Sequence, residues 1–198
     1  MELVLATRNK KKIEEIRRIT ESLEVRVRTL DDFPGCPDIE ENGTTFEENA
    51  ILKAVTAAKC TGVPALADDS GLEVFALNGA PGVRSARYAG EGGDDAKNVQ
   101  KLLKCLQGVK ERNARFVCCI ALAHPDGPVN TFLGYAEGII GTERRGDNGF
   151  GYDPVFFPEG YDRTFAEMGD EEKDSLSHRG KALEELRQFF KQKIKKKA

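Results

Sequence analysis

Two adjacent carboxylates, Asp68 and Asp69, follow the apolar run 63–67 and precede Ser70 and Gly71. Two half-buried acids side by side repel each other and lose hydration, so a cation is expected to offset that cost, and a divalent metal is the obvious candidate. Asp, Ser and Gly are also ordinary turn residues, so an ordinary hairpin turn remains the alternative. On either interpretation, the sequence predicts a turn here with strands on both sides.

A second group of polar residues is cationic. A strand-like segment, residues 2–6, leads into a helix predicted over residues 10–22. Open N–H groups and the dipole at a helix N-terminus favour a phosphate, whereas lysines there oppose the dipole unless an anion binds. A solvated basic turn is the alternative. Lys12 falls on the inward stripe of this helix. The residues at the junction are Thr7, Arg8, Asn9, Lys10, Lys11 and Lys12.

The next predicted helix, residues 45–60, begins with a capping-box pattern at Thr45 and Glu48. Lys53 lies in the middle of the apolar face of this helix. A lysine there either extends its ammonium to solvent or reaches an anion, and we favour the anion. The loop before the helix ends in a second acidic turn, which contains Glu41.

The C-terminal half carries residues suited to stacking and hydrogen bonding. The Gly-rich segment 146–154 lets backbone approach a ligand closely, and an aromatic side chain between glycines is a candidate stacking platform. A strained linker with core aromatics is the alternative. Lys173 follows in a polar stretch. His178 and Arg179 lie near the start of the last helix, and a His-Arg pair in such a place is often exposed at the surface without a function. The Gly-rich segment contains Phe150, Gly151, Tyr152 and Asp153.

The elements that position these residues alternate between strand and helix patterns, which predicts an α/β protein. Residues 24–29 alternate as a half-exposed strand, and 114–123 with 129–140 predict a long hairpin. Between them, residues 78–93 are expected to form a surface loop and residues 94–106 a helix. Nothing in the pattern marks a repeat or a linker, so the 198 residues form one domain or two closely packed lobes.

Composition restricts the class of protein. The chain is 39% hydrophobic and 32% charged, with a net charge of −3, as in soluble globular proteins. The lack of a basic excess argues against nucleic acid as the main partner. No apolar run approaches the ~20 residues of a membrane span, and the N-terminal run is too short for a signal peptide. We therefore expect neither a nucleic-acid nor a membrane partner.

The five cysteines show no CxxC spacing. An odd number without that spacing argues against a disulfide framework and against a zinc site. Cys118 and Cys119 lie in an apolar run and are expected to be small buried residues. A cysteine nucleophile would need a histidine, and only His124 and His178 exist. The cysteines thus predict a reducing, cytosolic compartment.

Phosphate-binding cations, magnesium carboxylates and a base pocket are the three needs of a nucleoside triphosphate enzyme, and the polar residues sort into these groups. The sequence closely resembles the inosine triphosphate pyrophosphatase family. The matching segments span nearly the whole chain in the family's order. They are Thr7-Arg8-Asn9-Lys10-Lys11-Lys12, Thr45-Phe46-Glu47-Glu48-Asn49-Ala50, Ala67-Asp68-Asp69-Ser70-Gly71-Leu72, Ser85-Ala86-Arg87-Tyr88, Phe150-Gly151-Tyr152-Asp153-Pro154 and Ser177-His178-Arg179-Gly180.

The resemblance implies an α/β fold with a long mixed sheet flanked by helices, in two lobes with a substrate cleft between them. It implies Mg²⁺-dependent hydrolysis of ITP, dITP and XTP to the monophosphate and pyrophosphate, which cleanses the cytoplasmic nucleotide pool, and a homodimer. A related pyrophosphatase acting on modified pyrimidine nucleotides or dUTP is one alternative. A catalytically silent nucleotide-binding module is another, although the acidic positions argue against it.

The resemblance also implies roles by position. Glu41 and Asp69 match the metal carboxylates, with Asp69 as proton acceptor, and Asp68 is expected to orient the turn or raise the basicity of Asp69. Many relatives carry Gly where this chain has Arg8. Donors such as Lys173 or Arg179 would meet the purine 6-oxo group. The expected substrate-binding residues are Thr7, Arg8, Asn9, Lys10, Lys11, Lys12, Lys53, Ser70, Phe150, Gly151, Tyr152, Asp153, Lys173, His178 and Arg179.

Overall fold

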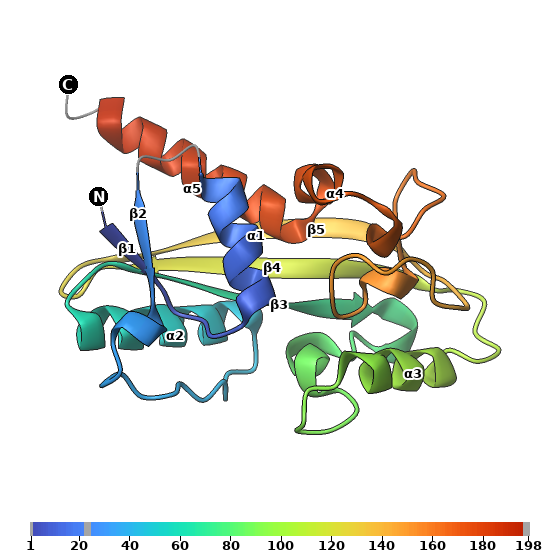
Figure 1. Ribbon diagram of the computed structural model, residues 1–198. Coiled ribbons are helices and arrows are strands. Elements are labelled where there is room, and N and C mark those ends of the chain that lie inside the picture. Colours follow the sequence, from blue (N-terminus) through green and yellow to red (C-terminus); the bar gives the residue numbers. More distant parts are fainter. Residues whose placement is uncertain (1, 22–24, 196–198) are drawn as a thin grey trace. The chain divides into compact units, whose positions relative to one another are not determined.

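A computed structural model describes residues 2–21 and 25–195. The chain divides into two compact units, each described here by itself. The first unit comprises Met1–Asp69, Cys118–Gly134 and Arg179–Ala198, and the second comprises Ser70–Val117 and Tyr135–His178. In the described residues, six strands form a sheet in the order β2-β1-β3-β4-β5-β6 (Figure 1). The strands are β1 (Glu2–Leu5), β2 (Arg26–Thr29), β3 (Ala65–Val74), β4 (Asn113–Ala123), β5 (Val129–Ile140) and β6 (Phe156–Pro158).

The sheet is mixed, which confirms the predicted α/β class. β1 pairs in parallel with both β2 and β3, whereas β5 pairs antiparallel with β6. β4 and β5 are neighbours joined only by residues 124–128, a connection too short for a parallel crossover, so the predicted hairpin is confirmed. The predicted end of the first helix, at residue 22, and the predicted start of the following strand, at residue 24, lie outside the described residues.

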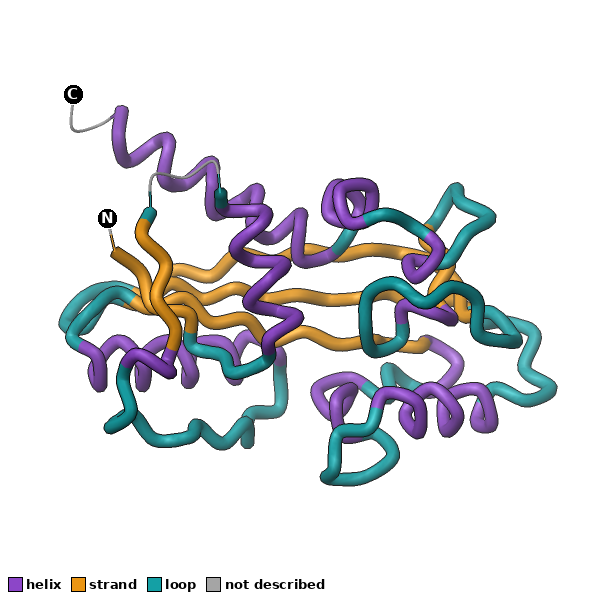
Figure 2. Tube along the Cα trace, viewed as in Figure 1, coloured by secondary structure: helices purple, strands orange, loops and turns teal. Residues whose placement is uncertain are grey.

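The core of the first unit lies between helices and strands. Helices α1 (Lys10–Thr20) and α5 (His178–Lys195) cover one face of the strands, and α2 (Phe46–Thr61) covers the other (Figure 1). Ile16 of α1 and Leu183 of α5 pack with β-strand residues such as Ile120 in one buried cluster. α2 begins at the predicted capping box, in which Thr45 Oγ1 accepts from the Glu48 N–H. A long loop precedes this helix (Figure 2).

The second unit has its own apolar core, in which three aromatic rings, Phe116, Phe156 and Phe165, stack within 6.0 Å of one another. α3 (Asp95–Cys105), which Asp94 caps, packs on this core. The segment predicted as a plain loop, 78–93, contains the 3₁₀ helix η3 (Gly82–Arg87), and the polar stretch around Lys173 forms α4 (Asp170–Leu176). No helix in the described part of the chain is long and apolar enough to span a membrane.

The predicted turn at Asp68 and Asp69 is wrong. Both residues lie inside β3, which runs without a break through Gly71 to Val74. The cause is burial. Polar residues that are usual in turns can lie within a strand when charged partners on both faces pair with them, because tertiary contacts then outweigh local propensity. Asp68 and Asp69 are only 1% and 4% exposed.

The cysteine pattern argues against a disulfide framework, but the described residues contain a disulfide. Cys36 and Cys60 are bonded to each other, with their Cα atoms 5.8 Å apart across a sequence separation of 24 residues. Cysteine spacing cannot reveal such a pair, because the contact depends on the loop before α2 folding back onto the end of that helix. The cysteines therefore no longer argue for a reducing compartment, whereas the predicted burial of Cys118 and Cys119 is confirmed.

Candidate functional site

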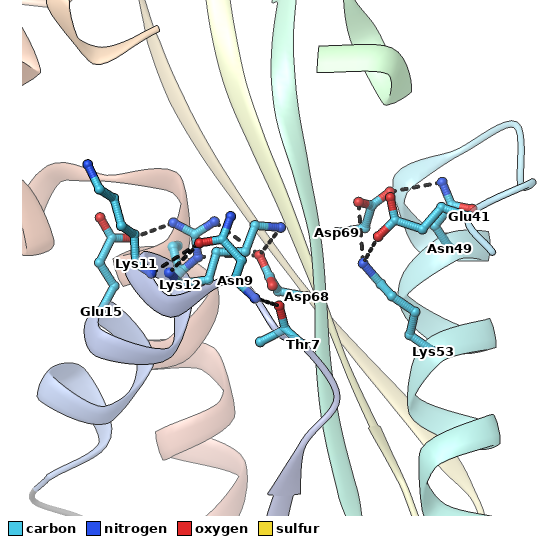
Figure 3. A network of polar contacts seen from close by, with 11 residues as sticks. Thr7, Asn9, Lys11, Lys12, Glu15, Glu41, Asn49, Lys53, Asp68 and Asp69 are labelled. Atoms are coloured by element: carbon cyan, nitrogen blue, oxygen red, sulfur yellow. Dashed lines mark hydrogen bonds and ion pairs between the residues drawn. The ribbon is translucent and has the colours of Figure 1, made fainter. Parts of the chain in front are cut away.

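The two neighbouring carboxylates, Asp68 and Asp69, point to opposite faces of β3 (Figure 3). Successive side chains of a strand alternate between its faces, so a pair in a strand is separated where a pair in a turn would not be. Asp68 lies on the side of α1, and Asp69 lies on the side of α2. The two acids therefore belong to different sets of contacts.

Asp69 meets two side chains of α2. Asn49 Nδ2 donates to Asp69 Oδ2 at 3.0 Å, and Lys53 Nζ lies 3.6 Å from Asp69 Oδ1. The same ammonium contacts the carboxylate of Glu41, so it lies between the two acids. Glu41 belongs to the acidic loop, defined here as residues 40–45, which ends at the cap of α2. The anion expected for Lys53 is thus a pair of protein carboxylates.

Burial and charge act in opposite directions on this pair. Burial raises the pKa of Asp69, and the Glu41 carboxylate raises it further, against the effects of the nearby lysines and of Asn49. Burial also acts to raise the pKa of Glu41, but Lys53 outweighs it and holds that pKa below its usual value. A raised pKa makes Asp69 the better proton acceptor of the two near neutral pH.

Asp68 lies in an ion-pair network on the other face of β3. Its Oδ2 atom is 3.1 Å from Lys12 Nζ and 3.0 Å from Arg179 Nη2, and Arg179 also pairs with Glu15 of α1. Although burial opposes ionisation, Lys12 and Arg179 hold the pKa of Asp68 far below its usual range. Asp68 thus pairs with two cations, and Glu41 is a like charge that raises the pKa of Asp69.

The N-terminus of α1 is already capped. Asn9 Oδ1 accepts from the backbone N–H groups of Lys11 and Lys12, and Thr7 Oγ1 accepts from the N–H of Asn9. Two of the N–H groups expected to be open for a phosphate are therefore engaged by the cap in this structure. Lys10 stands exposed at the first position of the helix.

Arg8 is tied to the loop that follows β2. Its Nε donates to Asp38 at 2.9 Å and its Nη1 to Asp31 at 3.1 Å. Both partners are exposed, so these pairs are screened by solvent. Arg8 therefore links the segment before α1 to a surface loop, and its role toward a substrate stays a prediction.

The second unit holds the stacking residues. Asp153 Oδ2 accepts from Lys173 Nζ at 2.7 Å and from the N–H of Phe150 at 2.9 Å, and the ammonium lies 5.0 Å from the centre of the Phe150 ring. Gly149 makes this approach possible, because its φ is +72° and a Cβ there would lie 2.1 Å from Asp153 Oδ2. A buried ion pair thus fixes an aromatic ring with a cation beside it.

The remaining expected residues have structural contacts of their own. The Gly151 N–H donates to Asp95 at 2.8 Å, and the Tyr152 hydroxyl donates to the backbone oxygen of Ser85 at 2.7 Å. His178 stacks on Phe116, with ring centres 4.7 Å apart and planes 9° apart. These contacts are structural, and the role of the three residues toward a nucleoside stays a prediction. Ser70 is half-buried in β3.

Within the first unit, the structure brings together most of the residues expected at the phosphates and the metal. Sequence reasoning missed Asn49 and Glu15, which complete the two sets around Asp69 and Asp68. Asn49 lies inside one of the matching segments, but its type alone does not identify its partner. Arg179, expected at the base, is 1% exposed and pairs with acids of the first unit, so its role in the nucleoside pocket stays a prediction.

The carboxylates of Glu41 and Asp69 fit the requirements of Mg²⁺. They are hard oxygen donors that already share one cation, the Lys53 ammonium. Mg²⁺ usually binds through one or two carboxylates together with substrate phosphates and waters, not in a cage made wholly of protein. In keeping with this, the described residues contain no group of three or more His, Cys, Asp or Glu side chains that would hold a metal alone.

Comparison with known proteins found relatives that match nearly the whole chain. A model of the Ham1 family matches residues 3–189. The dITP/XTP pyrophosphatase of Syntrophobacter fumaroxidans is 55% identical over 98% of this chain and 83% of that protein, and that of Bacillus anthracis is 47% identical over 93% and 94%. The Ham1 protein structure from Staphylococcus aureus has a TM-score of 0.89 at 44% identity, covering 98% of this chain and 100% of that one. A HAM1 protein structure from Coxiella burnetii has a TM-score of 0.89 at 47% identity, covering 97% and 99%.

Proposed function

Because the chain belongs to the Ham1 family, we propose that it is a Mg²⁺-dependent nucleoside triphosphate pyrophosphatase. The substrates are deaminated purine nucleotides, dITP, ITP and XTP, and the products are the monophosphate and pyrophosphate. The observation that carries the proposal is the carboxylate pair of Glu41 and Asp69 around a shared cation, in a chain about half identical to dITP/XTP pyrophosphatases. The arrangement is what metal-assisted hydrolysis requires.

Asp69 is the proton acceptor in this proposal. Asn49 donates to Oδ2 and holds the carboxylate in place, and Asp69 takes a proton from the water that attacks the α-phosphorus. Glu41 and Asp69 would hold Mg²⁺, which would supply positive charge for the leaving pyrophosphate. Lys53 and Lys12 add positive charge for the phosphates, and each is held in place by a buried acid.

The base is proposed to bind the stacking residues of the second unit. Phe150 offers the ring face, and Lys173 is the donor best placed within this set to meet a purine 6-oxo group. Adenine carries an amino group at that position, which would face the Lys173 ammonium donor to donor, and this disfavours ATP. Guanine shares the 6-oxo group, so its rejection needs a contact at position 2 of the ring.

We further propose a homodimer in the cytoplasm that removes deaminated nucleotides from the precursor pool. The support for these three points is the family relationship and the substrates named for the relatives. A silent nucleotide-binding module is disfavoured, because both proposed metal carboxylates, one of which is the proposed base, are present and contact one cation.

Substrate selectivity tests the base-binding part of the proposal. We expect kcat/KM for dITP and XTP to exceed that for ATP by at least about 10²-fold, because the 6-amino group of adenine cannot accept a hydrogen bond from the Lys173 ammonium. The measurement is initial-rate pyrophosphate release for ITP, dITP, XTP, GTP and ATP, with UTP and dUTP included. Equal values for ITP and ATP would contradict the 6-oxo argument, and a preference for dUTP would favour the pyrimidine alternative.

A further inference from the structure

Asn49 contacts both the acidic loop and Asp69. Its Nδ2 donates to Asp69 Oδ2 at 3.0 Å, and its Oδ1 accepts from the N–H of Gly43 at 2.8 Å. The side chain is 1% exposed, so water does not replace either bond when it is lost. One amide therefore joins the segment that carries Glu41 to the strand that carries Asp69 (Figure 3).

The hydrogen-bond partners fix which way this amide points. The N–H of Gly43 can only donate, so the amide oxygen must face it, and the NH₂ group must face Asp69. The reverse orientation would oppose two donors at Gly43 and two acceptors at Asp69. Asp69 Oδ2 is therefore kept as a hydrogen-bond acceptor by a chain of bonds that begins at the backbone of the acidic loop.

The acidic loop is anchored on the first turn of α2, two residues after Glu41. Gly43 approaches so closely that a Cβ there would lie 2.7 Å from Asn49 Oδ1 and 2.9 Å from Glu48 Cβ. The Glu48 carboxylate accepts from the N–H of Thr44 at 2.7 Å. These contacts hold the end of the loop against the helix that also carries Lys53.

The two oxygens of Asp69 are thereby divided between partners. Oδ2 is bonded to Asn49, whereas Oδ1 is the atom nearer Lys53, the cation that Glu41 shares. We infer that Asn49 is a positioning residue of the proposed reaction: it holds Asp69 Oδ2 as an acceptor and fixes the acidic loop, so that Oδ1 and the Glu41 carboxylate face the same cation. The inference rests on the proposed function. Partners that orient metal ligands typically contribute about 10–100-fold to metal affinity or activity.

Two substitutions separate the two bonds. Asn49→Ala removes both of them, whereas Asn49→Asp keeps the volume and an acceptor for Gly43 but, when ionised, cannot donate to Asp69 and adds a negative charge beside it. Asn98 supplies a matched control in the second unit. It is a buried asparagine of α3 whose Nδ2 donates to Ala86 O at 2.9 Å and whose Oδ1 accepts from the Ala89 N–H at 2.7 Å. Asn98→Ala thus loses the same kind of bridge away from the carboxylates.

The experiment measures kcat and KM with dITP, Mn²⁺ affinity without nucleotide, and hydrogen exchange at Gly43. We expect kcat to fall about 10–100-fold in both Asn49 variants with little change in KM, and Mn²⁺ to bind about tenfold more weakly to Asn49→Ala. The Gly43 amide should lose protection in Asn49→Ala and keep it in Asn49→Asp. Asn98→Ala should lower thermal stability while leaving kcat and Mn²⁺ affinity unchanged.

Normal kcat in Asn49→Asp would overturn the inference, because the bond to Gly43 would then suffice. An equal loss of kcat in Asn98→Ala would overturn it as well, since general destabilisation would explain both. Should Asn49→Ala fail to fold, Asn49→Asp carries the test. Absence of turnover in the wild-type protein would instead refute the proposed function, while Mn²⁺ affinity and Gly43 exchange would still decide the role of Asn49.

Discussion

Asp69→Asn is expected to lower kcat for dITP by about 10³-fold or more while the fold stays intact. The amide has the same shape as the carboxylate but neither accepts a proton at neutral pH nor carries the charge that binds a metal. The folded state loses little, because Asn49 can still donate to the new amide oxygen and Lys53 keeps Glu41 as its partner. Steady-state kinetics and thermal unfolding of the same preparation check both parts.

The control for this variant is Asp126→Asn, which makes the same exchange in the exposed turn between β4 and β5. It should keep wild-type kcat and stability. Near-normal kcat in Asp69→Asn would refute the assignment of Asp69 as the proton acceptor. A large loss of stability in that variant would show that Asp69 is retained for folding, as Asp68 is.

Asp68→Asn, the same exchange one residue earlier, is expected to destabilise the protein by about 3–5 kcal/mol. Its carboxylate is buried between Lys12 and Arg179, and Arg179 is itself only 1% exposed. Without the charge of Asp68, both cations stay buried with less compensation, although Arg179 keeps Glu15. The melting temperature should fall on the order of 10 °C, measured by circular dichroism or calorimetry.

An exposed ion pair provides the comparison. Asp31→Asn removes a partner of Arg8 at the surface, where such pairs contribute less than about 1 kcal/mol, so its melting temperature should change little. Equal shifts in the two variants would contradict the view that burial gives the Asp68 network its importance. The two exchanges at Asp68 and Asp69 should thus have opposite consequences, because β3 turns the two side chains to different faces.

Much of the fold could be predicted because it depends on patterns of residues that are close in sequence. The apolar runs of β4 and β5, the capping box at Thr45 and the helix that follows residue 94 depend only on neighbouring residues, and each is confirmed. The charged residues of the site could also be selected, because Lys53 on an apolar face and two adjacent buried acids need partners wherever they lie.

Contacts between residues that are distant in sequence could not be predicted from local patterns. Asp68 and Asp69 look like a turn by residue type, and only their contacts with α1 and α2 explain why they lie in a strand. The bond between Cys36 and Cys60 and the pairing of Arg179 with Glu15 join residues that no spacing connects. Tertiary contacts between charged and polar groups decided each of these points.

Product analysis with dITP, Mg²⁺ and ¹⁸O-labelled water tests the central claim most directly. Attack of water on the α-phosphorus predicts equal amounts of dIMP and pyrophosphate, with the label in dIMP, and loss of both products in Asp69→Asn. Formation of dIDP and inorganic phosphate, with the label in the phosphate, would contradict the proposed pyrophosphatase reaction. Mass spectrometry of the separated products distinguishes the two results.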